Sequence, residues 1–398
     1  MIVLAGGDLV LPDRLLPNAS LIFEGSRIAS VEPKARAAPA GADIVDCRDC
    51  YVVPGFIDVH VHGLEGCDTL DEGDPLARIA GTMPKYGVTA FCPTTVACPP
   101  RPLTALLRQV AQARANRPPT SARVLPAHLE SNFINPAFKG AQPGQCLRLP
   151  PGSAEAERDG DFSAAEILDV IAAARPDVGI VTLAPELPGG IDLVRSLVAA
   201  GHRVSVGHSG ADVDEAMAAI DAGARHATHL FNRMTPMSHR APGVAGAVLA
   251  RDEVTAELIC DGYHVHPAMC RIAIASKGAE GVMAITDGTG GSGLAVGSVA
   301  RLGGRPIRVS PHAAVLDDGT LAGSTLTGDR AFRNLVASVG LSVIEAAILC
   351  ATTPARALGL KDFGMLVQGA VADVVVLDRD FRVVRTVIDG HPVYESAG

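Results

Sequence analysis

PGFIDVHVHG, residues 54–63, is the segment from which the fold and a site can be worked out. Residues 56–61 are predicted to form an apolar β-strand that ends in two histidines, His60 and His62. Side chains two apart in a strand point to the same face, so both imidazoles project together with Asp58. Neutral imidazole is a common ligand for zinc and related metals. The alternative is a pair of partly exposed histidines beside a turn, and a metal site needs further ligands from elsewhere.

The composition of the chain limits the class of protein. Of its 398 residues, 48% are hydrophobic and 19% charged, which is typical of a soluble α/β enzyme. The net charge of -9, with no basic run, disfavours nucleic acid and anionic membranes as partners. Nine cysteines, with neither a signal peptide nor a transmembrane segment recognisable, indicate reduced thiols and a cytoplasmic location.

Strand and helix patterns alternate along the middle of the chain. The predicted strands are 56–61, 88–96, 122–131, 178–186, 202–209, 225–231, 253–262 and 281–288. The predicted helices are 75–86, 102–116, 163–174, 190–200, 211–222 and one after Pro267, with long loops at 132–161 and after 231. Eight strands with crossover helices predict a (β/α)₈ TIM-type barrel. A doubly wound open sheet is the alternative, but no Gly-rich phosphate turn follows the first strand.

Both ends of the chain are predicted to form short strands joined by turns. Residues 1–52 contain LIFEG, SRIASVEP and ADIVDC, and residues 360–398 contain ADVVVLD, FRVVRTVIDG and HPVY. We expect the two ends to form one small composite β-domain, beside a barrel of residues 53–359.

Polar residues gather at the ends of the predicted strands, whose bodies are almost free of charge. These residues are His60, His62, Thr94, Thr95, Glu130, Glu186, His208, His229, Asp261 with nearby His264, and Asp287. Barrel enzymes carry their chemistry at the C-terminal ends of strands. Strands that simply emerge into polar loops favour Ser, Asn and Lys over His and carboxylates. We therefore predict a metal site at the barrel mouth.

The donor set predicts which metals bind and what they do. Histidines and carboxylates suit zinc, with iron or manganese as alternatives, and can hold one or two ions. A divalent metal lowers the pKa of water and polarises a carbonyl. Asp287, at the last strand, is well placed to take and return the water's proton. No lysine lies at a strand end to form a carbamate bridge, so Glu130 is expected to be the central carboxylate.

Several motifs resemble the amidohydrolase superfamily and, within it, the N-acetylglucosamine-6-phosphate deacetylase family. They run along nearly the whole chain in the expected order: PGFIDVHVHG, HLESNFINPAFKGA (128–141), TLAPE (182–186), VGHSGA (206–211), THLFNRM (228–234), ICDGYHVHP (259–267), AITDG (284–288) and GSTLTG (323–328). The resemblance implies a metal-dependent barrel enzyme that releases acetate from an N-acetylated amino sugar phosphate.

The same resemblance implies roles for individual residues. It assigns a metal to Glu130, His208 and His229, and in some members a second metal to the histidine pair, here His60 and His62. It makes Asp287 the catalytic acid and base.

Other matching residues are implied to bind substrate. Asn232 and His264 correspond to contacts with the sugar or phosphate. Arg240 matches an arginine that reaches the substrate phosphate from the neighbouring subunit, which implies a homodimer.

Three departures from the family pattern bear on the substrate. Ser131-Asn132 stands where the family has Gly-Pro, Gln142 stands where it has histidine, and Arg233 stands where a small residue is usual. Glutamine can donate a hydrogen bond but cannot carry a proton charge. Arg233 either adds a phosphate contact or fills part of the sugar pocket. A metal, together with His264 or Gln142, is expected to polarise the substrate carbonyl.

We therefore expect a deacetylase acting on N-acetylglucosamine-6-phosphate. Alternatives with the same metal chemistry are N-acetylgalactosamine-6-phosphate, an N-acyl-D-amino acid or a cyclic amide. A purine or pyrimidine deaminase fits the motif around Glu130 poorly. A catalytically dead barrel is a different class, which bound metal would exclude.

Outside the site, Glu186 is interpreted as a structural carboxylate, His128 as a core histidine and His226 as a loop or surface residue.

Overall fold

The structure is a computed structural model that describes residues 1–34, 41–152 and 160–396. Residues 35–40 and 397–398 of the predicted β-domain, and 153–159 of the predicted loop 132–161, lie outside the described residues.

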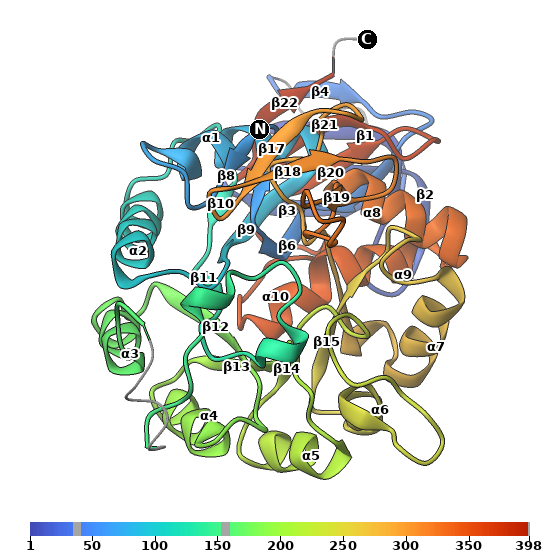
Figure 1. Cartoon of the computed structure of the whole chain (residues 1–398). Coiled ribbons are helices and arrows are strands. Elements are labelled where there is room, and N and C mark those ends of the chain that lie inside the picture. Colours follow the sequence, from blue (N-terminus) through green and yellow to red (C-terminus); the bar gives the residue numbers. More distant parts are fainter. Residues whose placement is uncertain (35–40, 153–159, 397–398) are drawn as a thin grey trace.

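A barrel of parallel strands occupies the middle of the chain (Figure 1). Its strands are β6 (Phe56–Val61), β9 (Val88–Thr95), β10 (Arg123–Val124), β11 (Ala127–Glu130), β12 (Val178–Leu183), β13 (Arg203–Val206), β14 (His226–Ala227), β15 (Thr255–Ile259) and β16 (Val282–Ile285). A parallel bridge between Val61 and Gly288, and a 2.9 Å hydrogen bond from the amide of Asp287 to the carbonyl of His60, join the last strand to the first. The (β/α)₈ prediction is confirmed.

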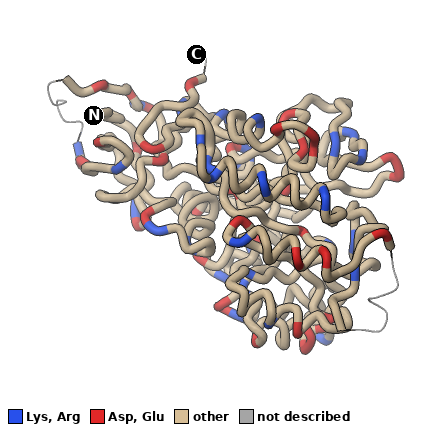
Figure 2. Tube along the Cα trace, turned by 90° about the vertical axis from the view of Figure 1, so that its left-hand side faces the viewer, with Lys and Arg blue, Asp and Glu red and all other residues tan. Residues whose placement is uncertain are grey.

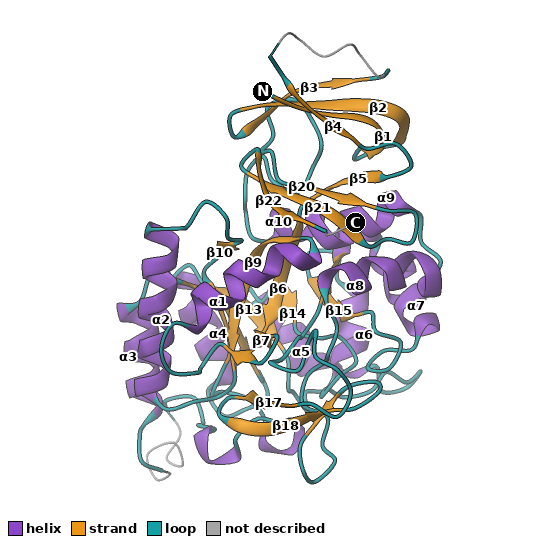
Figure 3. Cartoon of the chain, turned by 90° about the horizontal axis from the view of Figure 1, so that it is seen from above, coloured by secondary structure: helices purple, strands orange, loops and turns teal. Residues whose placement is uncertain are grey.

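Helices cover the outside of the barrel, as Figures 1 and 3 show. They are α1 (Pro75–Thr82), α2 (Pro100–Ala115), α3 (Ala164–Ala173), α4 (Gly190–Ala199), α5 (Val213–Asp221), α6 (Gly243–Ala250), α7 (Pro267–Lys277), α8 (Gly328–Asn334), α9 (Val343–Ala347) and α10 (Thr353–Ala357). Wider π-helical turns at Leu335–Val339 and Ile348–Thr352 extend α8 and connect α9 to α10. Every residue of β6, β9, β11, β12 and β16 is buried, as expected for a sheet covered on both faces.

Several strands are shorter than predicted, and α9 and α10 were not predicted. Two further differences concern the arrangement of the barrel. The single strand expected at 122–131 is divided into β10 and β11, which both pair with β9 and are separated by Leu125 and Pro126. Helix α6 lies within the loop that was expected after residue 231. Its sequence, GVAGAVLA, is apolar on all sides, so it has no polar face to give the amphipathic period of a surface helix.

Strands from both ends of the chain form one mixed sheet, which lies at the top of Figure 3. Its order is β22-β21-β20-β5-β1-β2-β3, with β4 also paired to β1. The strands are β1 (Ile2–Val10), β2 (Leu15–Glu24), β3 (Arg27–Glu32), β4 (Asp43–Asp46), β5 (Tyr51–Pro54), β20 (Val374–Leu377), β21 (Val383–Ile388) and β22 (His391–Glu395). The predicted β-structure built from both ends is confirmed, while the domain boundaries at 52 and 360 stay a prediction.

Two smaller sheets complete the fold, and neither was predicted from the sequence. One contains β17 (Val299–Leu302), β18 (Arg305–Val309) and β19 (Ala314–Val315), and the other pairs β7 (Gly63–Leu64) with β8 (Cys67–Asp68). The amide of Gly303 donates to Asp68 over 3.0 Å and ties the two together. In Figure 3, β17 and β18 lie at the opposite end of the molecule from the mixed sheet.

Charged residues of both signs are mixed along the face that Figure 2 shows. This mixture agrees with a sequence that has a net negative charge and no basic run. Among the described residues, no helix is both long and apolar enough to cross a membrane.

Candidate active site

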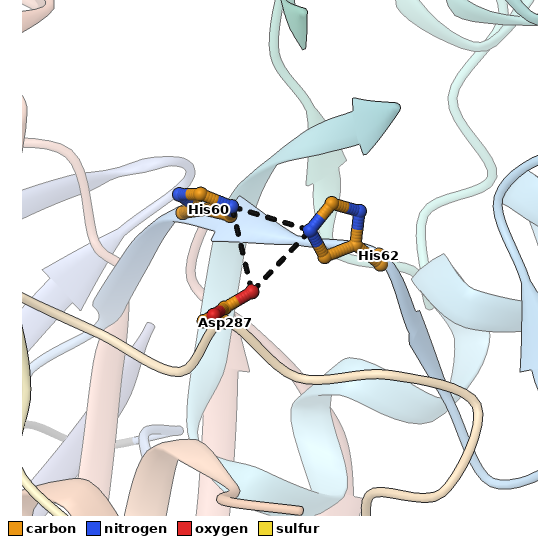
Figure 4. A group of neighbouring side chains, drawn as sticks. All are labelled: His60, His62 and Asp287. Carbon is orange, nitrogen blue, oxygen red and sulfur yellow. Dashed lines mark hydrogen bonds and ion pairs between the residues drawn. The ribbon is translucent and has the colours of Figure 1, made fainter. Parts of the chain in front are cut away.

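Three of the predicted site residues meet where β6 ends. His60 and His62 are 0% and 3% exposed, and their Nε2 atoms are 3.2 Å apart. Asp287, two residues beyond β16, brings its Oδ1 to 3.5 Å from Nε2 of His60 and 3.3 Å from Nε2 of His62. Figure 4 shows the three side chains converging. We call His60, His62 and Asp287 the first donor group.

Glu130, His208 and His229 form a second donor group from the ends of β11, β13 and β14. The Nε2 atoms of His208 and His229 lie 2.8 Å and 2.9 Å from Oε1 of Glu130 and 3.0 Å from each other. Glu130 also faces the first donor group, with Oε1 3.7 Å from Nε2 of His60 and Oε2 3.6 Å from Nε2 of His62. The buried carboxylate of Glu130 therefore stands between the two groups.

The backbone is left-handed at three of these positions. The φ angles are +49° at His208, +32° at His229 and +47° at Asp287. Such angles are uncommon for residues other than glycine and tend to cluster at functional sites. Here each follows a barrel strand by two residues and turns the chain as it leaves the barrel.

Hydrogen bonds on the far side of two rings fix which nitrogen faces the donor groups. Nδ1 of His208 donates to the carbonyl of Phe138 over 2.8 Å, and Nδ1 of His60 donates to Oε2 of Glu257 over 2.8 Å. A proton on Nδ1 leaves the Nε2 lone pair of each ring free to bind a metal.

The donor set fits a divalent metal. Imidazole nitrogen and carboxylate oxygen bind zinc at ~2.0–2.2 Å, so donors 2.8–3.0 Å apart can share one ion. Burial alone raises the pKa of Glu130, but the charges and hydrogen bonds of His208 and His229 lower it well below its ordinary value. Burial likewise disfavours a charged His229, yet Glu130 outweighs it and raises the pKa of that ring to about 9. The buried carboxylate of Glu130 thus favours a positive charge beside it.

An open cleft of about 490 Å³ leads to both donor groups. Two leucines from the region of the three-stranded sheet, Leu302 and Leu321, form part of its wall. The cleft also contains four predicted substrate-binding residues: Gln142, Asn232, Arg233 and His264. The fifth, Arg240, is exposed and is not among the residues that line the cleft.

Gln142 is held in one orientation and faces Glu130 of the second donor group. Its Oε1 accepts a 2.7 Å hydrogen bond from the amide of Ala97, and its Nε2 donates to Oε2 of Glu130. Because the backbone amide of Ala97 can only donate, the glutamine cannot exchange its oxygen and nitrogen. Gln142 therefore orients Glu130 in this structure, in addition to lining the cleft.

His264 and Arg233 present unpaired polar groups to the cleft. Nδ1 of His264 lies 2.6 Å from Oδ2 of Asp261, and its Nε2 has no hydrogen-bond partner among the described residues. Arg233 packs against Gly140, where an added Cβ would lie 2.9 Å from its Nε. Across the described residues no carboxylate forms an ion pair with Arg233, so its charge is free for an anionic ligand.

Two buried carboxylates support this region: the sequence placed Asp58 on the face of the two histidines without giving it a role, and Glu257 was missed. Glu257, inside β15, is 0% exposed and contacts His60. Asp58, inside β6, accepts hydrogen bonds from the hydroxyl of Thr286 at 2.5 Å and the amide of His60 at 3.2 Å. The available signal was a carboxylate within an otherwise apolar strand, since a buried charge needs a partner.

Three interpretations of neighbouring residues can also be compared with the structure. His128 is a core histidine, bonded to the carbonyl of Val59 at 2.9 Å and to the hydroxyl of Thr182 at 2.7 Å. Glu186 is a structural carboxylate, because it accepts hydrogen bonds from Asn135, Ser209 and the amide of Gly210. The prediction for His226 was wrong, since it lies inside the barrel at 3% exposure.

Comparison with known proteins identifies the family. The model of the amidohydrolase family matches residues 51–393. The chain belongs to the amidohydrolase family. It is therefore a hydrolase of carbon–nitrogen bonds, and the metal dependence of this family agrees with the two donor groups.

Individual relatives extend this comparison. N-acetylglucosamine-6-phosphate deacetylase from Bacillus subtilis is 32% identical, over 98% of this amidohydrolase and 96% of the relative. N-acetylgalactosamine-6-phosphate deacetylase from Escherichia coli O157:H7 is 34% identical, over 98% of both chains. A solved mutant of N-acetyl-D-glucosamine-6-phosphate deacetylase from Mycobacterium smegmatis, in complex with N-acetyl-D-glucosamine-6-phosphate, has a TM-score of 0.87 and 34% identity, over 98% of this chain and 99% of that one.

Proposed function

We propose that this amidohydrolase removes the acetyl group from N-acetylglucosamine-6-phosphate and releases acetate and the amino sugar phosphate. The observation that carries this proposal is one cleft with two donor groups and Asp287 at its base and a free cation, Arg233, in its wall. The donor groups at the bottom of the cleft suit metal-assisted amide hydrolysis, and the arginine suits a phosphate. The names of the relatives agree with both features.

In this proposal the donor groups hold one or two divalent ions, most simply zinc, with iron and manganese as alternatives. Glu130, His208 and His229 would hold one ion, and His60 with His62 would hold the other. Bound metal supplies Lewis acidity, which lowers the pKa of water and polarises the acetamide carbonyl.

In this proposal Asp287 carries out both proton transfers. Its carboxylate takes a proton from the attacking water as the water oxygen bonds to the carbonyl carbon. It then delivers that proton to the amide nitrogen as the carbon–nitrogen bond breaks, so the amino sugar leaves neutral. Its Oδ1 lies 3.5 Å from Nε2 of His60 and 3.3 Å from Nε2 of His62, which places the carboxylate beside the metal position proposed for the two histidines.

The remaining cleft residues bind substrate in this proposal. The free Nε2 of His264 and the amide of Asn232 orient the sugar, and Arg233 binds the phosphate. Gln142 orients Glu130 through a hydrogen bond and also lines the cleft wall. Arg240 lies outside the cleft lining, and we propose that it reaches the phosphate of a neighbouring subunit in a homodimer.

We also propose a cytoplasmic location and the division into residues 1–52 plus 360–398 and 53–359. Support for the location comes from the nine cysteines, all of which are free thiols. The division rests on the mixed sheet, whose strands come from both ends of the chain.

A second candidate substrate is N-acetylgalactosamine-6-phosphate. A relative with that activity in its name is as similar to this chain as those named for the glucosamine compound. The two sugars differ only at one hydroxyl, which the residues lining the cleft must distinguish.

Acetate release by metal-loaded enzyme tests the proposal. The substrates are N-acetylglucosamine-6-phosphate, N-acetylgalactosamine-6-phosphate and unphosphorylated N-acetylglucosamine. We expect the highest kcat/KM for the first and a large loss without the phosphate. Preference for the galactosamine compound selects the second candidate, and the absence of turnover with all three refutes the substrate class.

A further inference from the structure

Glu257 has an unusual position for a carboxylate. It lies in the middle of β15, a barrel strand whose neighbours Ala256, Leu258 and Ile259 are buried and apolar. Its own side chain is 0% exposed. A carboxylate in such a place is costly unless strong partners compensate for its lost hydration.

One oxygen of Glu257 contacts both donor groups. Oε2 lies 2.8 Å from Nδ1 of His60, in the first donor group, and 3.3 Å from the backbone amide of His229, in the second. The two contacts differ in kind. The first holds an imidazole ring, whereas the second is a longer contact with the main chain.

The other oxygen has no comparable contact. Among the described residues, Oε1 finds no hydrogen-bond partner, and Nδ1 of His128 is 3.7 Å away. His128 is already bonded through both nitrogens, to Val59 and Thr182, so it neither needs Glu257 nor has a lone pair free for a metal. Although His60, His128 and Glu257 are close enough to hold a metal, they form a support for the first donor group.

The histidine rings of the two donor groups differ in the hydrogen bonds that their Nδ1 atoms make. His208 donates from Nδ1 to the carbonyl of Phe138. Within the described chain, Nδ1 of His62 and Nδ1 of His229 have no hydrogen-bond partner. His60 depends on Glu257 alone for a ring hydrogen bond on the side away from its donor group.

We propose that Glu257 is a positioning residue for the metal position of the first donor group. The inference rests on metal binding in the proposed function. Glu257 fixes the proton of His60 on Nδ1, turns Nε2 toward His62 and Asp287, and makes the imidazole a stronger ligand through its negative charge. It has no comparable hold on any ring of the second donor group, so its loss affects one metal position more than the other.

Two variants separate the hydrogen bond from the charge. Glu257→Leu removes both, and leaves the Nδ1 proton of His60 buried without an acceptor. Glu257→Gln keeps the size, and its carbonyl oxygen can still accept from His60, but the charge is gone. Asp58→Asn is a matched control, because it changes another buried carboxylate, one that contacts the backbone of His60 and the amide and hydroxyl of Thr286 but no imidazole ring.

The readout is the zinc content per chain after dialysis against a series of buffered zinc concentrations. In the absence of substrate, this titration yields one affinity for each of the two metal positions. We expect two ions in the wild type. In Glu257→Leu we expect the affinity of the weakened position to fall roughly 10–100-fold with the other unchanged, and in Glu257→Gln a smaller fall at the same position. Asp58→Asn should leave the ratio of the two affinities as in the wild type.

Several outcomes overturn the inference. They are wild-type affinities in Glu257→Leu, an equal fall at both positions, a single ion in the wild type, or the same selective fall in Asp58→Asn. If Glu257→Leu does not fold, a selective fall in Glu257→Gln still supports the inference and an unchanged ratio overturns it. Wild-type enzyme that binds metal but does not release acetate refutes the proposed substrate and leaves this result standing.

Discussion

Replacement of Asp287 by asparagine should remove the proton transfers and leave the fold intact. The amide of Asp287 donates to the carbonyl of His60 at 2.9 Å, and its carbonyl accepts from the amide of Ser324 at 2.7 Å, so the backbone is tied on both sides. Its φ of +47° is one that asparagine also tolerates. Alanine at this position would add a backbone penalty of roughly 1–2 kcal/mol, which confuses a loss of chemistry with a loss of structure.

The magnitude follows from the role. General acid–base catalysis contributes about 10²–10⁴-fold to a rate, which corresponds to roughly 3–5 kcal/mol of activation free energy. We therefore expect kcat of Asp287→Asn to fall by about this factor, with a small change in KM, because the sugar contacts lie elsewhere in the cleft. An asparagine side-chain oxygen can still face His60 and His62, so most of the bound metal should remain.

The assay is acetate release from N-acetylglucosamine-6-phosphate, with zinc content and thermal unfolding measured on the same preparations. Metal content separates loss of the proton carrier from loss of the ion, and thermal unfolding reports the fold. A metal-loaded, folded Asp287→Asn enzyme with the wild-type kcat would refute the assignment of both proton transfers to this carboxylate.

Three further predictions concern the phosphate, the metal and a buried histidine. Arg233→Met should raise KM for the phosphorylated sugar roughly 10–100-fold, since a hydrogen bond to a charged group contributes about 1.5–3 kcal/mol. An equal rise in KM for the unphosphorylated sugar would contradict a phosphate contact. Chelation should lower the thermal midpoint and zinc should restore it, because a ligand present at 100 times its Kd stabilises by about 2.7 kcal/mol; an unchanged midpoint would speak against a bound metal. Burial, with a smaller effect of Arg203, lowers the pKa of His226 from 6.5 to about 3. Below about pH 6 the unfolded chain therefore binds one more proton than the folded protein, so the free energy of unfolding should fall by up to ~1.4 kcal/mol per pH unit. This fall should be less steep in His226→Asn. Urea unfolding of chelated protein at pH 6 and pH 4.5 measures both slopes.

The barrel could be predicted because its strands and most of its helices carry local signals. The segment 54–63 shows a strand that ends in polar residues. Helix α5 begins at Val213, and its N-cap residue Asp212 forms a capping box with Glu215. Helix α6 was missed because its burial on most sides removes the amphipathic period. The division of 122–131 depends on Pro126, whose position within the apolar run was a signal that the prediction did not use.

The donor residues of the site could be predicted for a geometric reason. In a parallel barrel all strands end at one face, so residues far apart in sequence, such as His60 and Asp287, come together whenever each ends its strand. The supporting residues follow no such rule. Glu257 and Asp58 lie within strands, and their roles depend on which neighbouring strand presents a donor to them.

Gln142 illustrates what only the fold could reveal. The sequence allowed it to contact the substrate, since it replaces a histidine of the family and lies in a loop near the third strand. The loop folds back so that Ala97, which follows β9, fixes the glutamine oxygen and turns the nitrogen onto Glu130. A histidine in this place could change its protonation during the reaction, whereas the fixed amide can only donate. In the proposed function, proton transfer therefore falls to Asp287, and polarisation of the carbonyl falls to bound metal and to the groups that would hold it.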